Sequence, residues 1–193
     1  EGLRYIRRKN ATGFHYFISN LGAEDVKGWI TISVPAKSIV LFDPLSGMAG
    51  VTKVKTENNK TQFYLQLKPG QSIILKTFTS KIVTGATFPE YQNAGQPEEL
   101  KGKWNLAFDE GNPVIKDKYT LDKLKSWTTL SDDLKIFSGT GSYSLDFNMP
   151  EGYADEWMLD LGKVCESARV TINGKNVGTV WSLPFEIPVG RFL

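Results

Sequence analysis

The sequence predicts an all-β protein made of two tandem antiparallel β-sandwich domains. Its apolar residues occur in short runs that alternate with polar residues, which is the pattern of half-buried strands. These runs are separated by Gly, Pro, Asn and Asp, and no long segment has a helical period of 3.6 residues. With 193 residues, the chain is long enough for two small domains that each bury a core.

The first predicted domain spans residues 1–80 and holds seven alternating runs. They cover residues 3–9, 14–20, 28–35, 38–44, 51–57, 61–70 and 72–78. The tetrapeptide "NATG" separates the first two runs and has the composition of a hairpin turn. We therefore expect at least one hairpin at the start of this domain.

Residues 81–102 are predicted to link the two domains. The surrounding stretch, "TSKIVTGATFPEYQNAGQPEELKG", is rich in Gly, Pro, Thr and Gln and has no periodicity. Such a composition is typical of a connection that crosses a surface.

The second predicted domain spans residues 103–193 and returns to alternating runs. They cover residues 103–108, 141–147, 156–162, 167–173, 175–181 and 184–189. Between the first two, "TLDKLKSW" at 120–127 predicts one short helical turn. The dipeptide Asn173-Gly174 joins two runs directly, which predicts a two-residue hairpin of type I′.

Charge and hydropathy argue against two classes of partner. The net charge is +2, from 23 Lys and Arg against 21 Asp and Glu, so no strong field would attract nucleic acid or anionic lipid. No apolar stretch reaches the length of a membrane span, and the first ten residues have no signal-peptide core. Because the sequence does not start with Met, we expect Glu1 to lie inside a longer polypeptide.

The sequence predicts no metal site and no cofactor. One His and one Cys are too few for an ordinary zinc cluster. His15 is interpreted as a packed or surface residue of a strand, and Cys165 as a buried structural thiol. A structural calcium ion stays open, because its ligands leave no compact signature outside the EF-hand.

No catalytic residue is predicted. The chain has no G-x-S-x-G nucleophile motif and no glycine loop that leads into a helix. Among its acids, Glu156, Asp160, Glu166 and the neighbours Asp132 and Asp133 are the candidates for a glycosidase pair. We favour solvated strand edges and turns for all of them. An autonomous glycosidase using Glu156 and Glu166 remains the less favoured alternative.

The aromatic residues of the second domain suggest a carbohydrate-binding site. Sugar rings stack on indole faces, while amide, guanidinium and carboxylate groups fix their hydroxyls. The candidates are Trp181, Trp127, Asn173, Arg169 and Glu166. Trp181 stands out because it ends a run just before "SLPF", where we weigh a ligand or domain contact equally against burial. The Asn-Gly turn geometry by itself explains Asn173, so its structural role is favoured.

Four ordered motifs resemble the galactose-binding-like jelly roll of many glycoside hydrolases, including the sugar-binding domain of the β-galactosidase and β-glucuronidase family. They are a "G-x-x-x-Y-x-x-x-F" strand at 139–147, "LDLGKV" at 159–164, "ARVTING" at 168–174 and "VGTVWSLPF" at 177–185. The resemblance implies a jelly roll for the second domain and carbohydrate as its class of ligand.

Most of the chain also resembles the large α-L-rhamnosidase-type enzymes of gut Bacteroidetes. The segments that show this resemblance are "GLRYIRRKN", "YFISNLG", "FDPLSG", "LQLKPGQSIIL" and "ELKGKWNLAF". In that family such segments follow a catalytic barrel that holds the catalytic acids, so none is carried over. Family members continue with a further strand past "VGRFL", and we therefore expect the jelly roll to be truncated at its C-terminus.

The resemblance implies a non-catalytic C-terminal accessory region of a periplasmic or extracellular glycoside hydrolase. Its partner would be the upstream catalytic barrel of the same polypeptide, and a plant-type oligosaccharide is a candidate ligand. Neither nucleic acid nor a membrane is expected as a partner. A purely structural β-sandwich interaction module is the main alternative.

Overall fold

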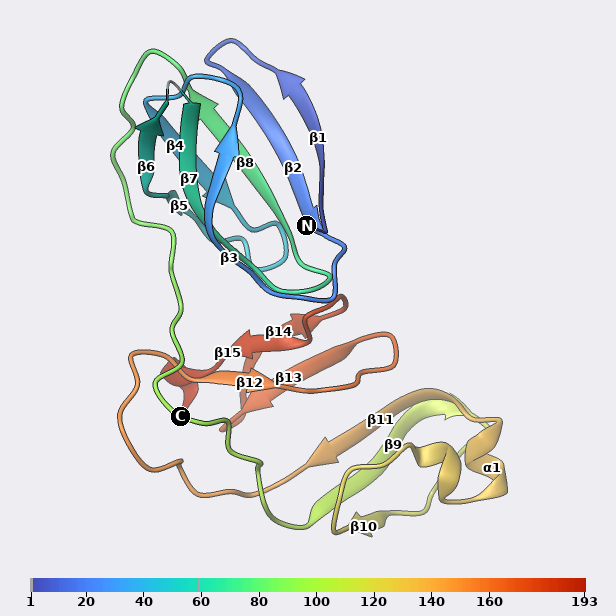
Figure 1. The fold of residues 1–193 in the computed structure, drawn as a ribbon. Helices are drawn as coiled ribbons and strands as arrows, with labels where there is room; N and C mark the ends of the chain where they lie inside the picture. Colours follow the sequence, from blue (N-terminus) through green and yellow to red (C-terminus); the bar gives the residue numbers. More distant parts are fainter. Residues whose placement is uncertain (1, 59) are drawn as a thin grey trace. The chain divides into compact units, whose positions relative to one another are not determined.

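The computed structural model describes residues 2–58 and 60–193 of the chain. These residues divide into two compact units, Glu1–Asn93 together with Ala154–Leu193, and Ala94–Tyr153. Nearly all regular structure is antiparallel β-strand (Figure 1). The prediction of an all-β fold is confirmed. The expectation about Glu1 lies outside the described residues.

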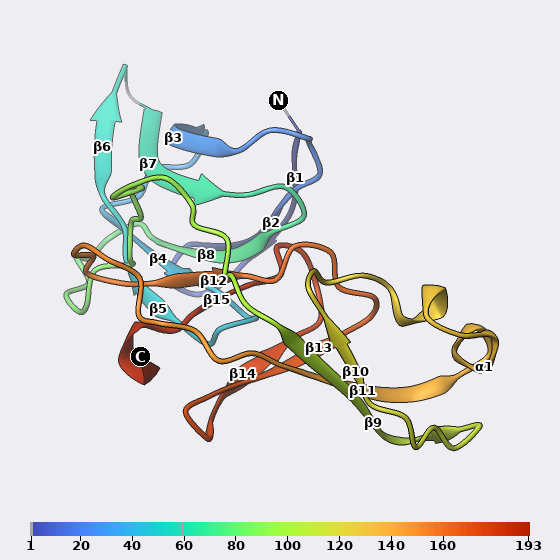
Figure 2. The same cartoon turned by 90° about the horizontal axis from the view of Figure 1, so that it is seen from below.

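The N-terminal part of the first unit is a sandwich of two antiparallel sheets. Five strands form one sheet in the order β1-β2-β8-β4-β5, and three form the other in the order β3-β7-β6. Figure 2 shows the two layers edge-on. The strands are β1 (Leu3–Lys9), β2 (Phe14–Asn20), β3 (Val26–Ile32), β4 (Ser38–Phe42), β5 (Ala49–Val51), β6 (Val54–Glu57), β7 (Lys60–Leu67) and β8 (Ser72–Phe78).

The sandwich core lies between the inner faces of the two sheets. In β7 the side chains alternate between buried and half-buried along the whole strand, as a strand with one face on a core must. Phe63, Leu65 and Leu67 are its buried apolar residues, and β8 contributes Ile73 and Leu75. These side chains form one continuous apolar cluster.

The segment predicted as a linker is fastened to the sandwich over its first part. Thr87 forms a parallel bridge with Val51 beside β5. Further on, the Tyr91 backbone exchanges hydrogen bonds of 2.8 and 2.9 Å with the Gln66 side chain. Lys53 and Glu90 form an ion pair of 2.6 Å. The predicted boundaries at 81 and 102 stay a prediction.

Two short antiparallel pairs complete the first unit. One pairs β12 (Met158–Asp160) with β15 (Glu186–Pro188), and the other pairs β13 (Ala168–Ile172) with β14 (Lys175–Val180). A 3-10 turn, η2 (Gly190–Phe192), follows β15. Lys68 of the sandwich and Glu186 of β15 form an ion pair of 2.6 Å, which holds this region against the sandwich.

The second unit is a three-stranded sheet of order β10-β9-β11 with two short helical turns. Its elements are β9 (Trp104–Asn112), β10 (Tyr119–Leu121), η1 (Trp127–Thr129), α1 (Asp132–Lys135) and β11 (Ser138–Ser144). The helical turn predicted at 120–127 is wrong in position, because its first residues belong to β10. Helix α1 forms instead where the Ser131 side chain caps Leu134 N and Asp132 and Asp133 fill the first turn.

Candidate functional site

The β13–β14 hairpin carries three of the five predicted binding residues and has the predicted turn. Asn173 and Gly174 have φ values of +51° and +73°, which is the left-handed pair that a type I′ turn requires. The strands pair from Ala168 with Val180 to Ile172 with Lys175, with a bulge after Val170. The prediction of a two-residue hairpin is confirmed.

The hairpin has a packed face and an open face. Val170 and Val180 are buried, and a Cβ at Gly178 would lie 2.9 Å from Ile187 Cδ1, so one face packs on β15. Arg169 and Thr179 form a cross-strand pair and are exposed. Because side chains alternate along a strand, this second face points away from the packed residues.

Trp181 follows β14 directly and leaves 63% of its surface exposed. It comes two residues after the exposed Thr179 and one after the buried Val180, so its position continues the open face. A large apolar side chain this exposed is a common feature of ligand or protein contacts. We name Arg169, Thr179 and Trp181 the hairpin face.

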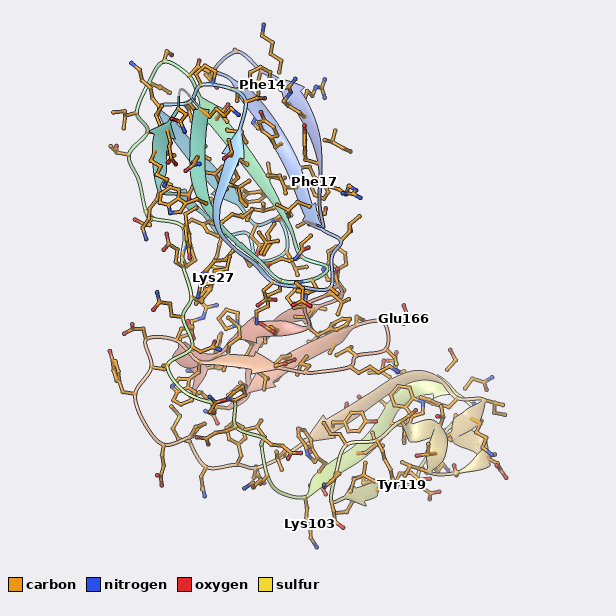
Figure 3. The ribbon with its side chains drawn as sticks, viewed as in Figure 1. Phe14, Phe17, Lys27, Lys103, Tyr119 and Glu166 are labelled. Atoms are coloured by element: carbon orange, nitrogen blue, oxygen red, sulfur yellow. The ribbon has the colours of Figure 1, made fainter. Side chains whose placement is uncertain are left out.

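Asn173 and Glu166 lie at the two ends of this hairpin. The Asn173 side chain donates through Nδ2 to the Phe192 carbonyl oxygen at 2.8 Å, so its amide ties the turn to η2. Glu166 is exposed in the loop before β13, with a φ of +76° (Figure 3). The structure thus gives Asn173 a structural contact and leaves Glu166 open to solvent.

Trp127 has a packing role in the other compact unit. Its ring lies 5.8 Å from Phe108 and 6.0 Å from Phe137, both edge-on. A Cβ at Gly141 would lie 2.9 Å from a Trp127 ring carbon. Trp127 therefore belongs to an aromatic cluster, while the other four candidates lie between β12 and β15 in the first unit.

Three of the five acids weighed for a glycosidase pair have structural contacts. Glu156 Oε1 accepts from the backbone N–H groups of Trp157 and Gly190 at 3.0 and 2.7 Å. Asp160 Oδ1 accepts from Gly162 N at 2.8 Å, and Asp132 pairs with Lys135 at 2.6 Å. These contacts agree with the favoured interpretation of turn and strand-edge residues.

Two open pockets were found among the described residues, and none of these acids lines either of them. One of about 490 Å³ belongs to the second unit and is lined by 97–101, 147, 148 and 150. The other, of about 650 Å³, is lined by Gly2 and residues 22–30. Neither pocket includes Glu156, Glu166 or a residue of the hairpin face.

The described residues contain no group of three or more His, Cys, Asp or Glu side chains placed to hold a metal ion. His15 lies in β2, where its Nδ1 and Asn10 Nδ2 are 2.9 Å apart. Cys165 is exposed in the loop before β13, so its interpretation as a buried thiol is wrong. Across the described part of the chain, no helix has the length and hydropathy needed to cross a membrane.

Sequence analysis missed a cluster on the sandwich. Trp29 of β3 and Tyr64 of β7 are cross-strand neighbours on the outer face of the three-stranded sheet. The signal was present in "KGWITI", where Lys27, Trp29 and Thr31 alternate with residues of the core side. It was overlooked because only the tryptophans of the second domain were weighed.

Comparison with solved structures finds one with a similar fold. A rhamnosidase from Novosphingobium sp. PP1Y superposes with a TM-score of 0.77 and 23% identity, over 99% of this chain and 18% of that one. In fold, the chain is similar to part of a rhamnosidase. No protein-family model matches it.

A curated protein of Formosa agariphila named "Putative beta-glucuronidase" is 29% identical over 169 residues. The match covers 83% of this chain but only 14% of that protein. Both relatives bear names of glycoside hydrolases, and the chain spans less than a fifth of each.

Proposed function

We propose that this chain is a non-catalytic accessory region of a glycoside hydrolase of the α-L-rhamnosidase or β-galactosidase type. The observation that carries the proposal is the small share of each relative that the chain spans, 18% and 14%, while 99% and 83% of its own length are matched. The catalytic barrel of the same polypeptide is its proposed partner. The names of the relatives support a periplasmic or extracellular location.

Carbohydrate binding is proposed for the hairpin face. Trp181 offers an indole for stacking on a sugar ring, and Arg169 and Thr179 offer donors and an acceptor beside it. Glu166, at the end of the preceding loop, adds a carboxylate within the same part of the chain. We assign residues 103–193 to a galactose-binding-like jelly roll, on the strength of the four ordered motifs.

A glycan array tests this binding. The unmodified chain is expected to retain plant-type oligosaccharides weakly, and Trp181→Ala is expected to lose them. Phe17→Ala is the matched control, because Phe17 is also an exposed aromatic residue but lies on β2. Retention that survives Trp181→Ala would contradict the assignment of this face.

The non-catalytic part of the proposal has its own assay. Release of nitrophenol from aryl rhamnosides, glucuronides and galactosides is expected to stay at the buffer rate even at high protein concentration. Turnover that disappears in Glu156→Gln and Glu166→Gln would support the autonomous glycosidase instead.

One observation favours a structural module as a second candidate. Ile6, Phe17, Ile74 and Phe42 form a continuous cross-strand row on the outer face of the five-stranded sheet. Ile6 is 73% exposed, and Arg4, Arg8 and Lys76 flank the row on the same face. An apolar row of this kind is typical of a packing surface for another domain.

This second candidate makes a different prediction. In the longer polypeptide, Ile6→Glu would place a carboxylate in the packed surface and lower the melting temperature of the barrel. No glycan would bind. An unchanged melting temperature together with binding at Trp181 would leave the carbohydrate-binding proposal as the better one.

A further inference from the structure

The outer face of the three-stranded sheet carries aromatic and cationic side chains in register. Trp29 pairs with Tyr64, Thr31 with Gln62 and Lys27 with Gln66 across β3 and β7. On the other side of β7, Lys55 pairs with Gln62. The residues next to them along each strand point into the sandwich core. These paired side chains therefore all lie on the solvent-facing side of the sheet.

Trp29 and Tyr64 form the centre of this face. Their ring centroids are 5.9 Å apart at an interplanar angle of 78°. Lys55 Nζ lies 4.6 Å from the Trp29 ring and Lys53 Nζ 5.5 Å from the Tyr64 ring. Trp29 still exposes 41% of its surface, so part of the indole remains open to a ligand.

Positive charge is in excess on this face. The face carries four lysines but only two carboxylates. The lysines are Lys27, Lys53, Lys55 and Lys60, and the carboxylates are those of Glu57 and Glu90. Glu90 pairs with Lys53 at 2.6 Å, and Glu57 lies 3.7 Å from Lys55. Within the described residues, Lys27 and Lys60 form no ion pair, so the face can attract an anion.

Hydroxyl-binding groups lie beside the rings. Gln62 donates through Nε2 to Thr31 Oγ1 at 3.2 Å, while its Oε1 is buried and has no hydrogen-bond partner in the described part of the chain. An unpaired amide oxygen gains from a donor brought by a ligand. Rotation of the Gln62 side chain, which is only half-buried, would present that oxygen.

An open pocket adjoins this face along β3. It has a volume of about 650 Å³, and its lining includes Lys27 and Trp29 together with the carboxylates of Glu24 and Asp25. An anionic ligand would therefore bind at the Lys27–Trp29 side of the pocket, toward Lys55. That space is in the range of small-molecule sites and suits one or two sugar rings. Figure 3 labels Lys27 at the beginning of β3.

We propose that Trp29, Tyr64, Lys27 and Lys55 form a binding site for an acidic oligosaccharide built from uronic acids. The sugar C–H groups stack on the open part of Trp29, the carboxylates pair with Lys27 and Lys55, and hydroxyls bond to Thr31 and Gln62. The site extends the proposed carbohydrate binding but uses none of the residues of the hairpin face. Charge complementarity selects carboxylated over neutral sugars.

The probe is a hexamer of galacturonic acid, titrated into the full chain by calorimetry or by NMR of the Trp29 indole N–H. The methyl-esterified hexamer is the matched ligand, since it keeps the rings but lacks the charges. We expect the acid form to bind, the ester to bind at least about fivefold more weakly, and 0.5 M NaCl to weaken the acid form.

Variants locate the site. Trp29→Ala is expected to weaken binding about tenfold, and Lys27→Gln and Lys55→Gln about two- to fivefold each. Phe17→Ala, with a similar exposure of 44%, is expected to bind as the unmodified chain does. Because the two lysines are exposed, their replacement leaves the fold intact. If Trp29→Ala unfolds, the two lysine variants therefore still test the site.

Any of three results would overturn the site. The first is a failure of the acid hexamer to bind at about 10 mM, a concentration on the order of the dissociation constants of the weakest sugar sites. The other two are equal binding of the ester and unchanged binding in the lysine variants. Trp181→Ala separates this inference from the proposed function. Loss of acid binding in Trp181→Ala alone would assign the ligand to the hairpin face and reject the Trp29 site, whereas loss in Trp29→Ala alone would do the reverse.

Discussion

Asn20 is a buried polar residue that holds together three segments of the sandwich. It is fully buried at the end of β2, where its Nδ2 donates to the Glu24 and Leu67 carbonyl oxygens at 2.8 and 3.1 Å. Its Oδ1 accepts from Gly22 N at 3.0 Å. One amide therefore bonds to three backbone groups from two separate segments.

Replacing Asn20 by Ala should therefore be costly. Asn20→Ala leaves the two carbonyls and the Gly22 N–H without their partner, and we expect a loss of about 2–3 kcal/mol in the free energy of unfolding. Asn176→Ala, at an exposed position of β14, is the control. Equilibrium urea unfolding measures both, and equal stabilities would contradict the role of Asn20.

Tyr91 is the residue whose titration should change stability at high pH. Burial, followed by the nearby Glu156 and Asp43 carboxylates, raises the pKa of the Tyr91 hydroxyl above the ordinary tyrosine value of about 10. The unfolded chain then loses this proton at a lower pH than the folded chain does. Because the unfolded state binds fewer protons in that range, stability should fall as the pH rises above about 10.

Absorbance at 295 nm follows the Tyr91 titration directly. Tyr91→Phe is expected to remove one tyrosine step from the upper part of the titration and to flatten the loss of stability above about pH 10. Tyr153→Phe provides a comparison at an exposed tyrosine, where the solvent-facing ring is 86% accessible. An identical pH profile in Tyr91→Phe would show that the three causes do not act on this group.

At the scale of single residues, local chemistry was predictable and packing was not. Asn173 and Gly174 specify their turn through φ values that few other pairs adopt, so sequence sufficed. Trp127 could not be placed, because its partners Phe108 and Phe137 come from different elements. Trp181 was singled out by its position at a strand end, and the structure finds it exposed.

Glu156 acts at the scale of an element, where it closes the β12–β15 pair. Its Oε1 bonds to Trp157 N before β12 and to Gly190 N after β15. Val189 N adds a bond to the Trp157 carbonyl oxygen at 2.8 Å. The carboxylate thus takes up two N–H groups where the strand ladder ends.

We expect Glu156→Ala to open this end of the β12–β15 pair. The amides of Ile187, Val189 and Gly190 should exchange with solvent faster, while Glu156→Gln, which keeps an acceptor oxygen, should have less than half the effect. Glu166→Ala is the matched control, since Glu166 is exposed in a loop. The measurement is hydrogen exchange read by mass spectrometry. Equal exchange rates in all three variants would exclude the role of Glu156 in closing the β12–β15 pair.

Strands were predictable wherever a core imposes alternation. The run at 61–70 contains most of β7, whose Thr61, Phe63, Leu65 and Leu67 are buried in turn. Short elements were not, because β10 has only three residues and its Leu121 is the single buried one. Three residues are too few for a period, so the polar residues that follow suggested a helix instead.

The whole first unit depends on a contact between its N-terminal sandwich and its C-terminal strands. Lys68 Nζ lies 2.7 and 2.6 Å from the two Glu186 carboxylate oxygens, and the Glu186 side chain is 17% exposed. Leu183 packs on Gly70 next to it. This ion pair is better shielded than an ordinary surface pair.

Charge reversal tests this contact. Lys68→Glu should weaken the docking of β15 by about 1 kcal/mol, and the double exchange Lys68→Glu with Glu186→Lys should recover much of it. Lys163→Glu, on an exposed loop, is the control. The readout is the rate of amide hydrogen exchange at Glu186 and Ile187, at low and at high salt. A double variant whose rates equal those of Lys68→Glu would refute the pairing.

At this scale, the sequence indicated the sandwich but not the way in which its later segments attach. Residues 81–93 have no periodicity, yet the Tyr91 backbone is held by Gln66 and Glu90 by Lys53. Backbone bonds to a distant side chain leave no mark in composition, so this segment resembled a free linker. The contact of Glu186 with Lys68 was hidden for the same reason.

The Lys68–Glu186 contact joins residues 118 positions apart, which bears on the order of events during translation. A ribosome adds residues at about 5–20 per second, so Lys68 waits on the order of ten seconds for its partner. Strands β1–β8 can form their own core in that interval. The finished sandwich would then act as a template on which the last forty residues assemble as they emerge.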